Sequence, residues 1–137
     1  MQKILAILFL ALSFNAQADS LHGKAIWCKS EPNQHAEAQF WFVDGHVLQA
    51  DTIEYSIVKH DLGAYRADAF HITWADDHQY FGGALVLYRL FRAELRLYQE
   101  QTQSDYEKWY QCELSSEAEI DRHLTDRINR YKEKNKI

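Results

Sequence analysis

Short runs of apolar residues, some continuous and some alternating with polar ones, divide most of this chain into segments typical of β-strands. The clearest pair flanks Asp44-Gly45, with Phe40-Trp41-Phe42-Val43 before it and Val47-Leu48 after it. An Asp-Gly pair accepts the positive φ angles of a two-residue type I′ turn, whose twist matches that of paired antiparallel strands. Because residues 40–43 are apolar on both alternate faces, the pattern predicts a strand that is covered on both sides.

Further segments of this kind follow at short intervals. Strands are expected at 23–29, 53–59, 65–74, 84–90, 94–99 and 106–114, with turns at 30–33, 61–63, 76–78 and 101–105. In the segment 53–59, Ile53, Tyr55 and Ile57 alternate with polar residues and predict a half-buried strand. A single bent strand over 84–99 is the alternative to two strands there. Seven or eight short strands in succession predict a mainly β fold, either a small antiparallel β-sandwich or an up-and-down β-barrel.

The C-terminal residues 115–137 have a helical period instead. Apolar residues recur on one stripe at Ile120, Leu124, Ile128 and Tyr131, and Ser116-Glu117-Ala118-Glu119 fits a capping box. Acidic residues crowd the first turn and basic residues the last turns, as the helix dipole favours. We expect an amphipathic helix that packs on the β domain as a lid, with Trp41 buried beneath its apolar stripe or under a neighbouring subunit. A helix that binds a partner is the alternative.

The N-terminal segment has the pattern of a signal peptide. Lys3 supplies a positive charge, residues 4–12 are all apolar, and Ala16-Gln17-Ala18 fits the small-x-small cleavage pattern. Nine apolar residues fall well short of the ~20 that span a bilayer, and no later segment is apolar enough. We therefore predict a signal peptide at 1–18 cleaved before Asp19, an antiparallel β domain at 19–114 and a helix at 115–137. The expected location is periplasmic or secreted.

The two cysteines, Cys28 and Cys112, fit an exported protein. In such a chain an even cysteine count predicts a disulfide, and two residues permit a single intramolecular connectivity. The bond would join the first strand of the domain to the last. By restricting the unfolded chain, it would stabilise the folded state by roughly 4–5 kcal/mol. A reactive thiol or a metal pair is the weaker alternative, because no Cys-x-x-Cys spacing exists.

The charge of the chain argues against nucleic acid as a partner. Residues 19–114 carry 15 acids and 8 bases, whereas residues 115–137 carry 5 acids and 6 bases. Phosphate binding needs a basic stripe that releases counterions, and an acidic β domain does not provide one. The tail 130–136 is locally basic but too short to change this conclusion.

Seven histidines raise the question of a metal site. Two ligands need a spacing of two residues on a strand, or three or four on a helix, and no two histidines have it. One local group contains ligand-type residues, and we interpret it as a solvated loop rather than a metal site. We expect no metal and no other cofactor. The group consists of His71, Asp76, Asp77 and His78.

Catalytic motifs give no positive signal. The chain contains no Gly-x-Ser-x-Gly, no His-Glu-x-x-His and no phosphate-cradling glycine loop, so we assign no catalytic residue. A paired-carboxylate site stays open, because a β domain with 15 acidic residues places some of them side by side.

Four tryptophans are the candidate ligand-binding residues. Trp27, Trp41, Trp74 and Trp109 accompany a large number of tyrosines and phenylalanines. The favoured interpretation is that large rings fill the core of a small β fold, and the functional one is an aromatic-lined cavity or surface strip. Strand alternation points Trp27 and Trp109 to the face opposite the cysteines, and Trp41 away from its neighbouring phenylalanines. Tryptophans facing solvent would mark a binding surface, whereas tryptophans under the helix would be structural.

The chain resembles small exported single-domain bacterial proteins of no assigned function. The resemblance lies in the segments 23–28 (GKAIWC), 90–97 (LFRAELRL), Gln111-Cys112 and a helix ending at 134–137 (KNKI). It implies an exported, disulfide-closed protein of a Gram-negative bacterium and transfers no site. A calycin-like barrel with a C-terminal helix is a looser comparison at the level of fold, since the Gly-x-Trp signature of lipocalins is absent.

Together these features predict an exported β domain that binds a small ligand or a component of the cell envelope without catalysis. A protein-binding module, such as an inhibitor or an envelope accessory factor, is the alternative, and a hydrolase with an unrecognised carboxylate site is the third. An enclosed cavity would favour the first hypothesis, and a flat exposed aromatic patch the second.

Overall fold

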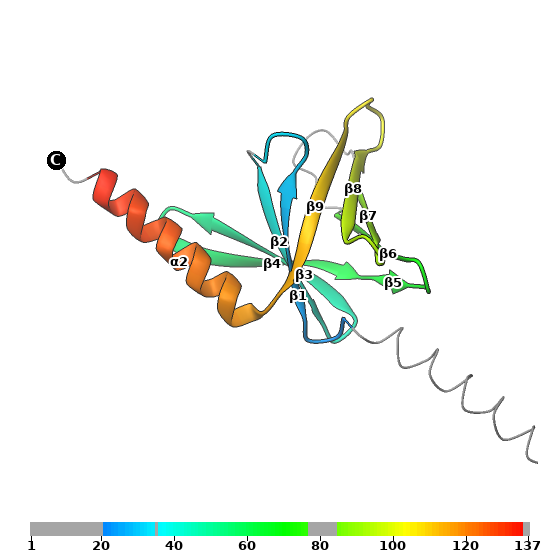
Figure 1. Cartoon of the computed structure of the whole chain (residues 1–137), viewed down its shortest axis with the longest axis horizontal. Coiled ribbons are helices and arrows are strands. Elements are labelled where there is room, and N and C mark those ends of the chain that lie inside the picture. Colours follow the sequence, from blue (N-terminus) through cyan, green and yellow to red (C-terminus); the bar gives the residue numbers. More distant parts are fainter. Residues whose placement is uncertain (1–20, 35, 77–84, 136–137) are drawn as a thin grey trace, which may run out of the picture.

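The computed structural model describes residues 21–34, 36–76 and 85–135, in which nine strands precede one long helix. Figure 1 shows the strands wrapped around a common centre, with the helix along one side. The predicted signal peptide lies outside the described residues, as do Asp77 and His78. The elements are β1 (Ala25–Ser30), β2 (Glu37–Val43), β3 (His46–Ile53), β4 (Ser56–Ala64), β5 (Arg66–Ala67), β6 (His71–Asp76), β7 (Val86–Phe91), β8 (Arg96–Gln101), β9 (Glu107–Ser115) and α2 (Glu117–Lys134).

The strands form one antiparallel sheet in the order β4-β3-β2-β1-β9-β8-β7-β6-β5. Neighbours in the sheet are also neighbours in the sequence except at one place, where β1 pairs with β9. At the far end of this order, β4 is followed directly by β5 and also contacts β6, so the sheet curls back on itself. The predicted mainly β fold with a C-terminal helix is confirmed, in the form of a nearly closed barrel.

The turn between β2 and β3 is the one that the sequence predicts. Asp44 and Gly45 have φ angles of 52° and 76°, and Val43 pairs with His46 across them. The strand before this turn is covered on both faces as expected. Its alternate residues enter two separate apolar clusters, one inside the barrel and one under α2.

A second two-residue turn, between β3 and β4, corrects the strand predicted at 53–59. Glu54 and Tyr55 form this turn, with Glu54 at a φ of 57°. Positive φ angles are uncommon for residues other than glycine, so the sequence carries no turn signal here. Ile53 and Tyr55 consequently lie at the tip of a hairpin, about half exposed, and are not part of a half-buried face.

Two further predictions around β4 are wrong. Residues 61–63 do not turn, because β4 runs through them with Leu62 buried, and Gly63 lies beside a shift in the β3–β4 register. The strand predicted at 65–74 is instead a hairpin of β5 and β6. The Asp68 carboxylate makes this turn, accepting hydrogen bonds from the amides of Phe70 and His71 at 2.7 Å each, and these bonds lower the pKa of Asp68.

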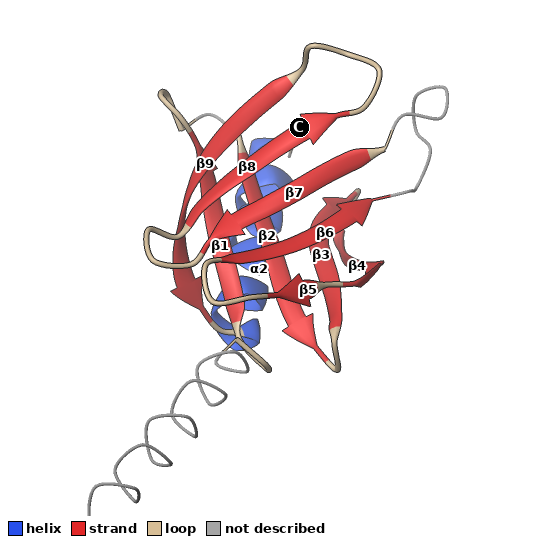
Figure 2. Cartoon of the chain, turned by 90° about the vertical axis from the view of Figure 1, so that its right-hand side faces the viewer, coloured by secondary structure: helices blue, strands red, loops and turns tan. Residues whose placement is uncertain are grey.

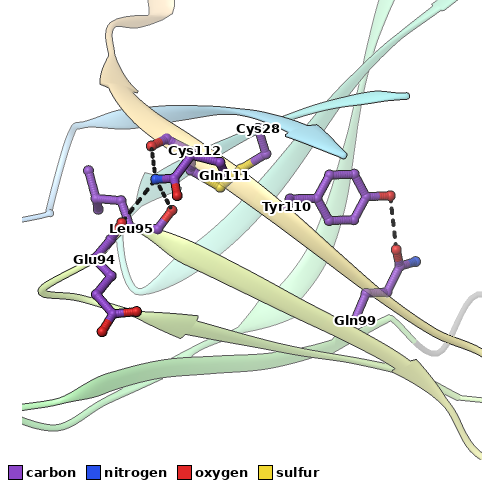
Figure 3. Close-up of a disulfide and its surroundings, with 7 residues drawn as sticks. All are labelled: Cys28, Glu94, Leu95, Gln99, Tyr110, Gln111 and Cys112. Carbon is purple, nitrogen blue, oxygen red and sulfur yellow. Dashed lines mark hydrogen bonds between the residues drawn. A yellow bond between two sulfur atoms is a disulfide. The ribbon is translucent and has the colours of Figure 1, made fainter. Parts of the chain in front are cut away.

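The predicted disulfide is present. Cys28 and Cys112 face each other directly in the β1–β9 pair, which is where the order of the strands departs from the order of the chain (Figure 3). Beside the bond, the side-chain amide of Gln111 donates to the carbonyl oxygens of Glu94 and Leu95 at 3.0 and 3.4 Å. These contacts hold the β7–β8 turn against β9, and the presence of this turn confirms two strands rather than one over 84–99.

The predicted helix is confirmed, with part of its capping box. The Ser116 hydroxyl accepts the amide hydrogen of Glu119 at 3.1 Å, while the Glu119 carboxylate accepts a bond from Ser115 at 3.0 Å. Ile120 and Leu124 are fully buried in the cluster that contains Trp41. α2 is therefore a docked lid, as expected. Across the described residues, no helix has the length and apolar character needed to cross a membrane.

Candidate functional site

The outer surface of the barrel has two halves of different character. α2 packs over strands β1 to β4, with its buried residues against Ala25, Trp41 and Ala50. Strands β5 to β9 lie on the opposite side, toward the viewer in Figure 2, and no described element covers them. A ligand that binds to the outside of the barrel would therefore meet open sheet on this second half, which we call the uncovered face.

Two of the four candidate tryptophans are packed inside the protein. Trp41 is 1% exposed and lies beneath α2, and Trp74 points into the barrel, stacked on Tyr88 with ring centroids 5.2 Å apart. The expectation that Trp41 lies under the helix is confirmed. Both rings fill cores, but Trp74 also borders a pocket, described below, together with Tyr88.

The other two tryptophans are on the outside of the barrel. Trp27 lies at the edge of α2, with the His123 ring centroid 3.7 Å away. Trp109 lies on the uncovered face, where Tyr98 and Phe91 are 4.8 and 5.7 Å from it. The four tryptophans therefore do not meet in one place, and only Trp109 lies on the uncovered face.

Of the local group of metal-ligand types, the structure describes His71 and Asp76, and it does not bring these two together. His71 and Asp76 are five positions apart on β6 and so point to opposite faces of the sheet. The His71 ring instead packs edge-on against Phe91 at 5.0 Å, with Nδ1 3.6 Å from the Asp68 carboxylate. Over the ranges that the structure describes, no three His, Cys, Asp or Glu side chains are placed to hold a metal ion.

A row of larger side chains crosses the uncovered face. Paired residues on neighbouring strands point to the same side of a sheet, and the pairing connects β5 to β9 through five such positions. These positions are Arg66, Thr73, Arg89, Tyr98 and Trp109. The register thus lines up two arginines, a hydroxyl and two aromatic rings that are far apart in the sequence.

The first four residues of this row line a pocket of about 400 Å³. Ala75, Leu87 and Glu100, which form the next row on the same face, also line it. Its size falls within the roughly 300–1,000 Å³ of small-molecule sites, and it combines an apolar floor with a few polar groups, as such sites do. The pocket lies on the outside of the barrel, whereas the small-ligand hypothesis drawn from the sequence invoked an aromatic-lined cavity.

The arginines give this pocket its charge. All four arginines of residues 19–114 lie on β5 to β8 or the turns between them. Arg96 is paired with Glu31 at 2.8 Å, and Arg92 donates to the Asp68 carbonyl at 2.8 Å. Arg66 and Arg89 are both exposed, and neither makes an ion pair or hydrogen bond with any other described side chain. Two guanidinium groups are therefore available at the pocket.

Tyr98 forms a fixed wall beside the arginines. Its hydroxyl donates to Glu107 at 3.0 Å and lies 3.4 Å from Glu100, the residue opposite Glu107 in the β8–β9 pair. The hydrogen bond to Glu107 raises the pKa of Tyr98, so the hydroxyl stays protonated at neutral pH. Glu100 and Glu107 are neighbouring carboxylates, as the acidic composition of the β domain predicts. Here both lie beside the Tyr98 hydroxyl and hold its ring in place.

Trp109 extends this wall into an aromatic cluster. The Arg96 guanidinium lies 4.4 Å above the Trp109 ring, and Phe91 and Tyr98 flank it. The Phe91 and Tyr98 rings are stacked and tilted against Trp109, and aromatic pairs contribute roughly 0.5–1.5 kcal/mol each beyond the area that they bury. The cluster stiffens the sheet next to the pocket, so the positions of Arg89 and Tyr98 are set by rigid strands.

The inside of the barrel holds a separate polar group near one end. The Tyr110 hydroxyl donates to Gln99 at 3.1 Å, as Figure 3 shows, and Gln99 donates to the Tyr88 hydroxyl at 3.5 Å. Burial raises the pKa of Tyr110 to about 12 and that of Tyr88 further. Both phenols are therefore neutral at physiological pH and serve as hydrogen-bonding parts of the core.

A second polar cluster joins α2 to the barrel. Glu37 on β2 forms an ion pair with Arg127, and its carboxylate lies 3.4 Å from His123 Nε2. With Arg130 these residues line a pocket of about 310 Å³. Because both partners of Glu37 come from α2, the cluster acts as a polar clamp that complements the apolar contact of the helix with Trp41.

The sequence analysis missed Arg66 and Arg89, because their proximity depends on the pairing of β5, β6 and β7. One signal was available: the arginines of the β domain occur only from Arg66 onward, whereas its lysines are spread along the domain. No protein-family model, curated protein or solved structure matches this chain.

Proposed function

We propose that this protein binds a small acidic ligand, or an acidic group of a cell-envelope component, at the pocket on the uncovered face. The observation that supports this most directly is the pair Arg66 and Arg89, which line one pocket without an acidic partner among the described residues. The protein has a net charge of −5, so two cations without acidic partners on one surface are a local exception to its overall negative charge. The pocket itself contains one carboxylate, Glu100.

The chemistry of the pocket indicates the kind of ligand. An arginine guanidinium binds carboxylate or phosphate through two parallel hydrogen bonds, which adds direction to the charge attraction. Thr73 lies between the two arginines in the row and supplies a hydroxyl donor. Leu87 and Ala75 offer an apolar surface next to the Tyr98 ring. A ligand that matches this set carries one anionic group and one flat apolar or ring-shaped part.

The chemical groups that line the pocket are suited to binding a ligand without catalysis. The hydroxyl of Tyr98 donates to Glu107, and its raised pKa keeps it protonated, so it is not available as a base or nucleophile. Thr73 has a hydroxyl, and none of the other residues that line the pocket is a histidine, cysteine or lysine that could activate it. On the predicted signal peptide, we propose that this binding takes place outside the cytoplasm, in the periplasm or after secretion.

The proposal can be tested with two matched dyes. 8-Anilinonaphthalene-1-sulfonate has an anionic group and aromatic rings, and N-phenyl-1-naphthylamine is the same molecule without the sulfonate. We expect the chain from Asp19 onward, which keeps every described residue, to bind the sulfonate dye more tightly than the neutral one. Removing an arginine hydrogen bond at a solvent-exposed pocket should weaken binding about five- to tenfold, below the full value of a charged hydrogen bond.

Two double variants separate the pocket from general charge. Arg66→Gln with Arg89→Gln removes both pocket cations, whereas Lys24→Gln with Arg122→Gln removes the same charge from exposed positions elsewhere. The first should abolish the preference for the sulfonate dye, and the second should leave it intact. Competition with inorganic phosphate or with glucuronate then tells whether phosphate or carboxylate is preferred. Equal binding of the sulfonate dye by both double variants would contradict the proposal.

A further inference from the structure

The end of the molecule formed by the β3–β4 turn and the last turns of α2 exposes large apolar side chains. Ile53, Tyr55 and Tyr131 are 50%, 51% and 62% exposed. Lys132 Nζ lies 5.3 Å from the Tyr55 ring, which places the turn next to the helix. Figure 1 shows this end on the side away from β5 to β8. We call residues 53–55 together with 127–134 the helix tip.

The helix tip is also locally basic. Residues 127–134 carry four bases and one acid, Glu133. Arg127 is neutralised by Glu37, but Arg130, Lys132 and Lys134 form no ion pair with an acidic side chain in the described parts of the chain, and Lys132 lies beside the Tyr55 ring. Glu54 in the turn is the remaining acid of the tip. The tip therefore keeps a positive balance at the end of a protein whose net charge is −5.

We propose that the helix tip docks this protein on an anionic lipid surface, independently of the pocket on the uncovered face. Tyrosine is favoured at the level of lipid headgroups, because its ring is apolar and its hydroxyl remains hydrated. Lysine and arginine next to such rings attract anionic lipids while their stems cover apolar surface. Tyr55 and Tyr131 beside Arg130, Lys132 and Lys134 combine both features at one projecting end.

The shape of the tip favours a lipid surface over a peptide. A peptide that binds in a groove needs a continuous apolar floor that buries several anchors. The pocket of about 350 Å³ between the turn and the helix has only Ile128 and Tyr131 as apolar lining, with Thr52, Glu54 and Arg127 as the rest. The exposed apolar side chains instead belong to a hairpin turn and a helix end, and such a surface can enter a soft headgroup layer with little rearrangement.

Flotation with vesicles tests this proposal on the chain from Asp19 onward, which retains every described residue and lacks the apolar N-terminal segment. We expect binding to vesicles of phosphatidylcholine mixed with phosphatidylglycerol, and much weaker binding to phosphatidylcholine alone. Each basic residue near an anionic bilayer contributes about fivefold to affinity. Arg130→Gln with Lys134→Gln should therefore weaken binding about 20- to 30-fold. Tyr55→Ser with Tyr131→Ser should weaken binding to the mixed vesicles as well.

The control is Lys24→Gln with Arg122→Gln, which changes the net charge equally but leaves the helix tip intact. Normal vesicle binding by this control, together with weak binding by the two tip variants, would support the proposal. Equal weakening by the control would overturn it in favour of unspecific charge attraction. Binding that is unchanged in the tip variants, or absent from the parent protein, would overturn it as well. Thermal unfolding followed by circular dichroism confirms that each variant is folded.

Discussion

The clearest test of how this fold is held together is the substitution Trp41→Ala. Trp41 is 1% exposed and lies between β2 and the apolar stripe of α2, in contact with a cluster that includes Ile120 and Leu124. The Lys59 ammonium lies 4.3 Å above its ring and is bonded to Glu117 at 2.8 Å. Truncating this one side chain therefore removes the largest buried side chain that the barrel presents to the helix.

The expected loss of stability follows from the buried area. A tryptophan side chain buries roughly 150–250 Å², which at about 25 cal/mol per Å² corresponds to about 4–6 kcal/mol. Loss of the Lys59 contact adds about 0.5–1 kcal/mol. Trp41 Nε1 is buried with no hydrogen-bond acceptor among the described residues, so removing this N–H offsets the loss of stability by about 1 kcal/mol or more. Alanine keeps part of the buried area, and the net loss should be about 3–5 kcal/mol.

Guanidinium unfolding followed by far-ultraviolet circular dichroism measures this loss without relying on tryptophan fluorescence. Trp41→Phe is the matched control, because it keeps a large ring and removes the unpaired N–H, and it should cost no more than about 1 kcal/mol. Hydrogen exchange should show the α2 amides losing protection first in Trp41→Ala. If Trp41→Ala stays within about 1 kcal/mol of the parent, the helix is not held by this contact and our account of the second core is wrong.

Three other predictions concern stability. Replacing Cys28 and Cys112 by alanine should lower the free energy of unfolding by about 4 kcal/mol, since the bond closes a separation of 84 residues; an unchanged denaturation midpoint would contradict this. Gln39 is 3% exposed and its Nε2 has no partner among the described residues, so Gln39→Leu should raise the free energy of unfolding, and a clear loss would reveal an unseen acceptor. The pKa of Tyr110 is raised from 10 to about 12, so above pH 10 the unfolded chain binds fewer protons than the folded one and stability should fall toward pH 12. Urea unfolding should show a shallower fall for Tyr110→Phe, and an identical slope would exclude this phenol as a cause.

Local chemistry in the chain was sufficient to predict much of the architecture. The Asp44-Gly45 turn, the Ser116 cap with its helical stripe, and the disulfide follow from a few neighbouring residues or from the small number of cysteines. The burial of Trp41 was also predictable, because a strand that is apolar on both faces needs a second cover, and the only amphipathic helix predicted in the sequence could supply it. The turn and the helix depend on preferences that act over a few residues, and the other two inferences follow because the sequence offers a single possible partner.

Features that depend on pairing between distant strands could not be predicted from the sequence. Glu54 adopts a positive φ because the pairing of β3 with β4 requires a tight turn there, although glutamate has no preference for it. In the sequence, Gly63 indicates a turn, but in the structure it lies within the continuous strand β4 beside a register shift. Arg66 and Arg89 line the same pocket because β6 lies between their strands in a fixed register. Strand register depends on the packing of the whole barrel, so the candidate site becomes visible only once the sheet has closed.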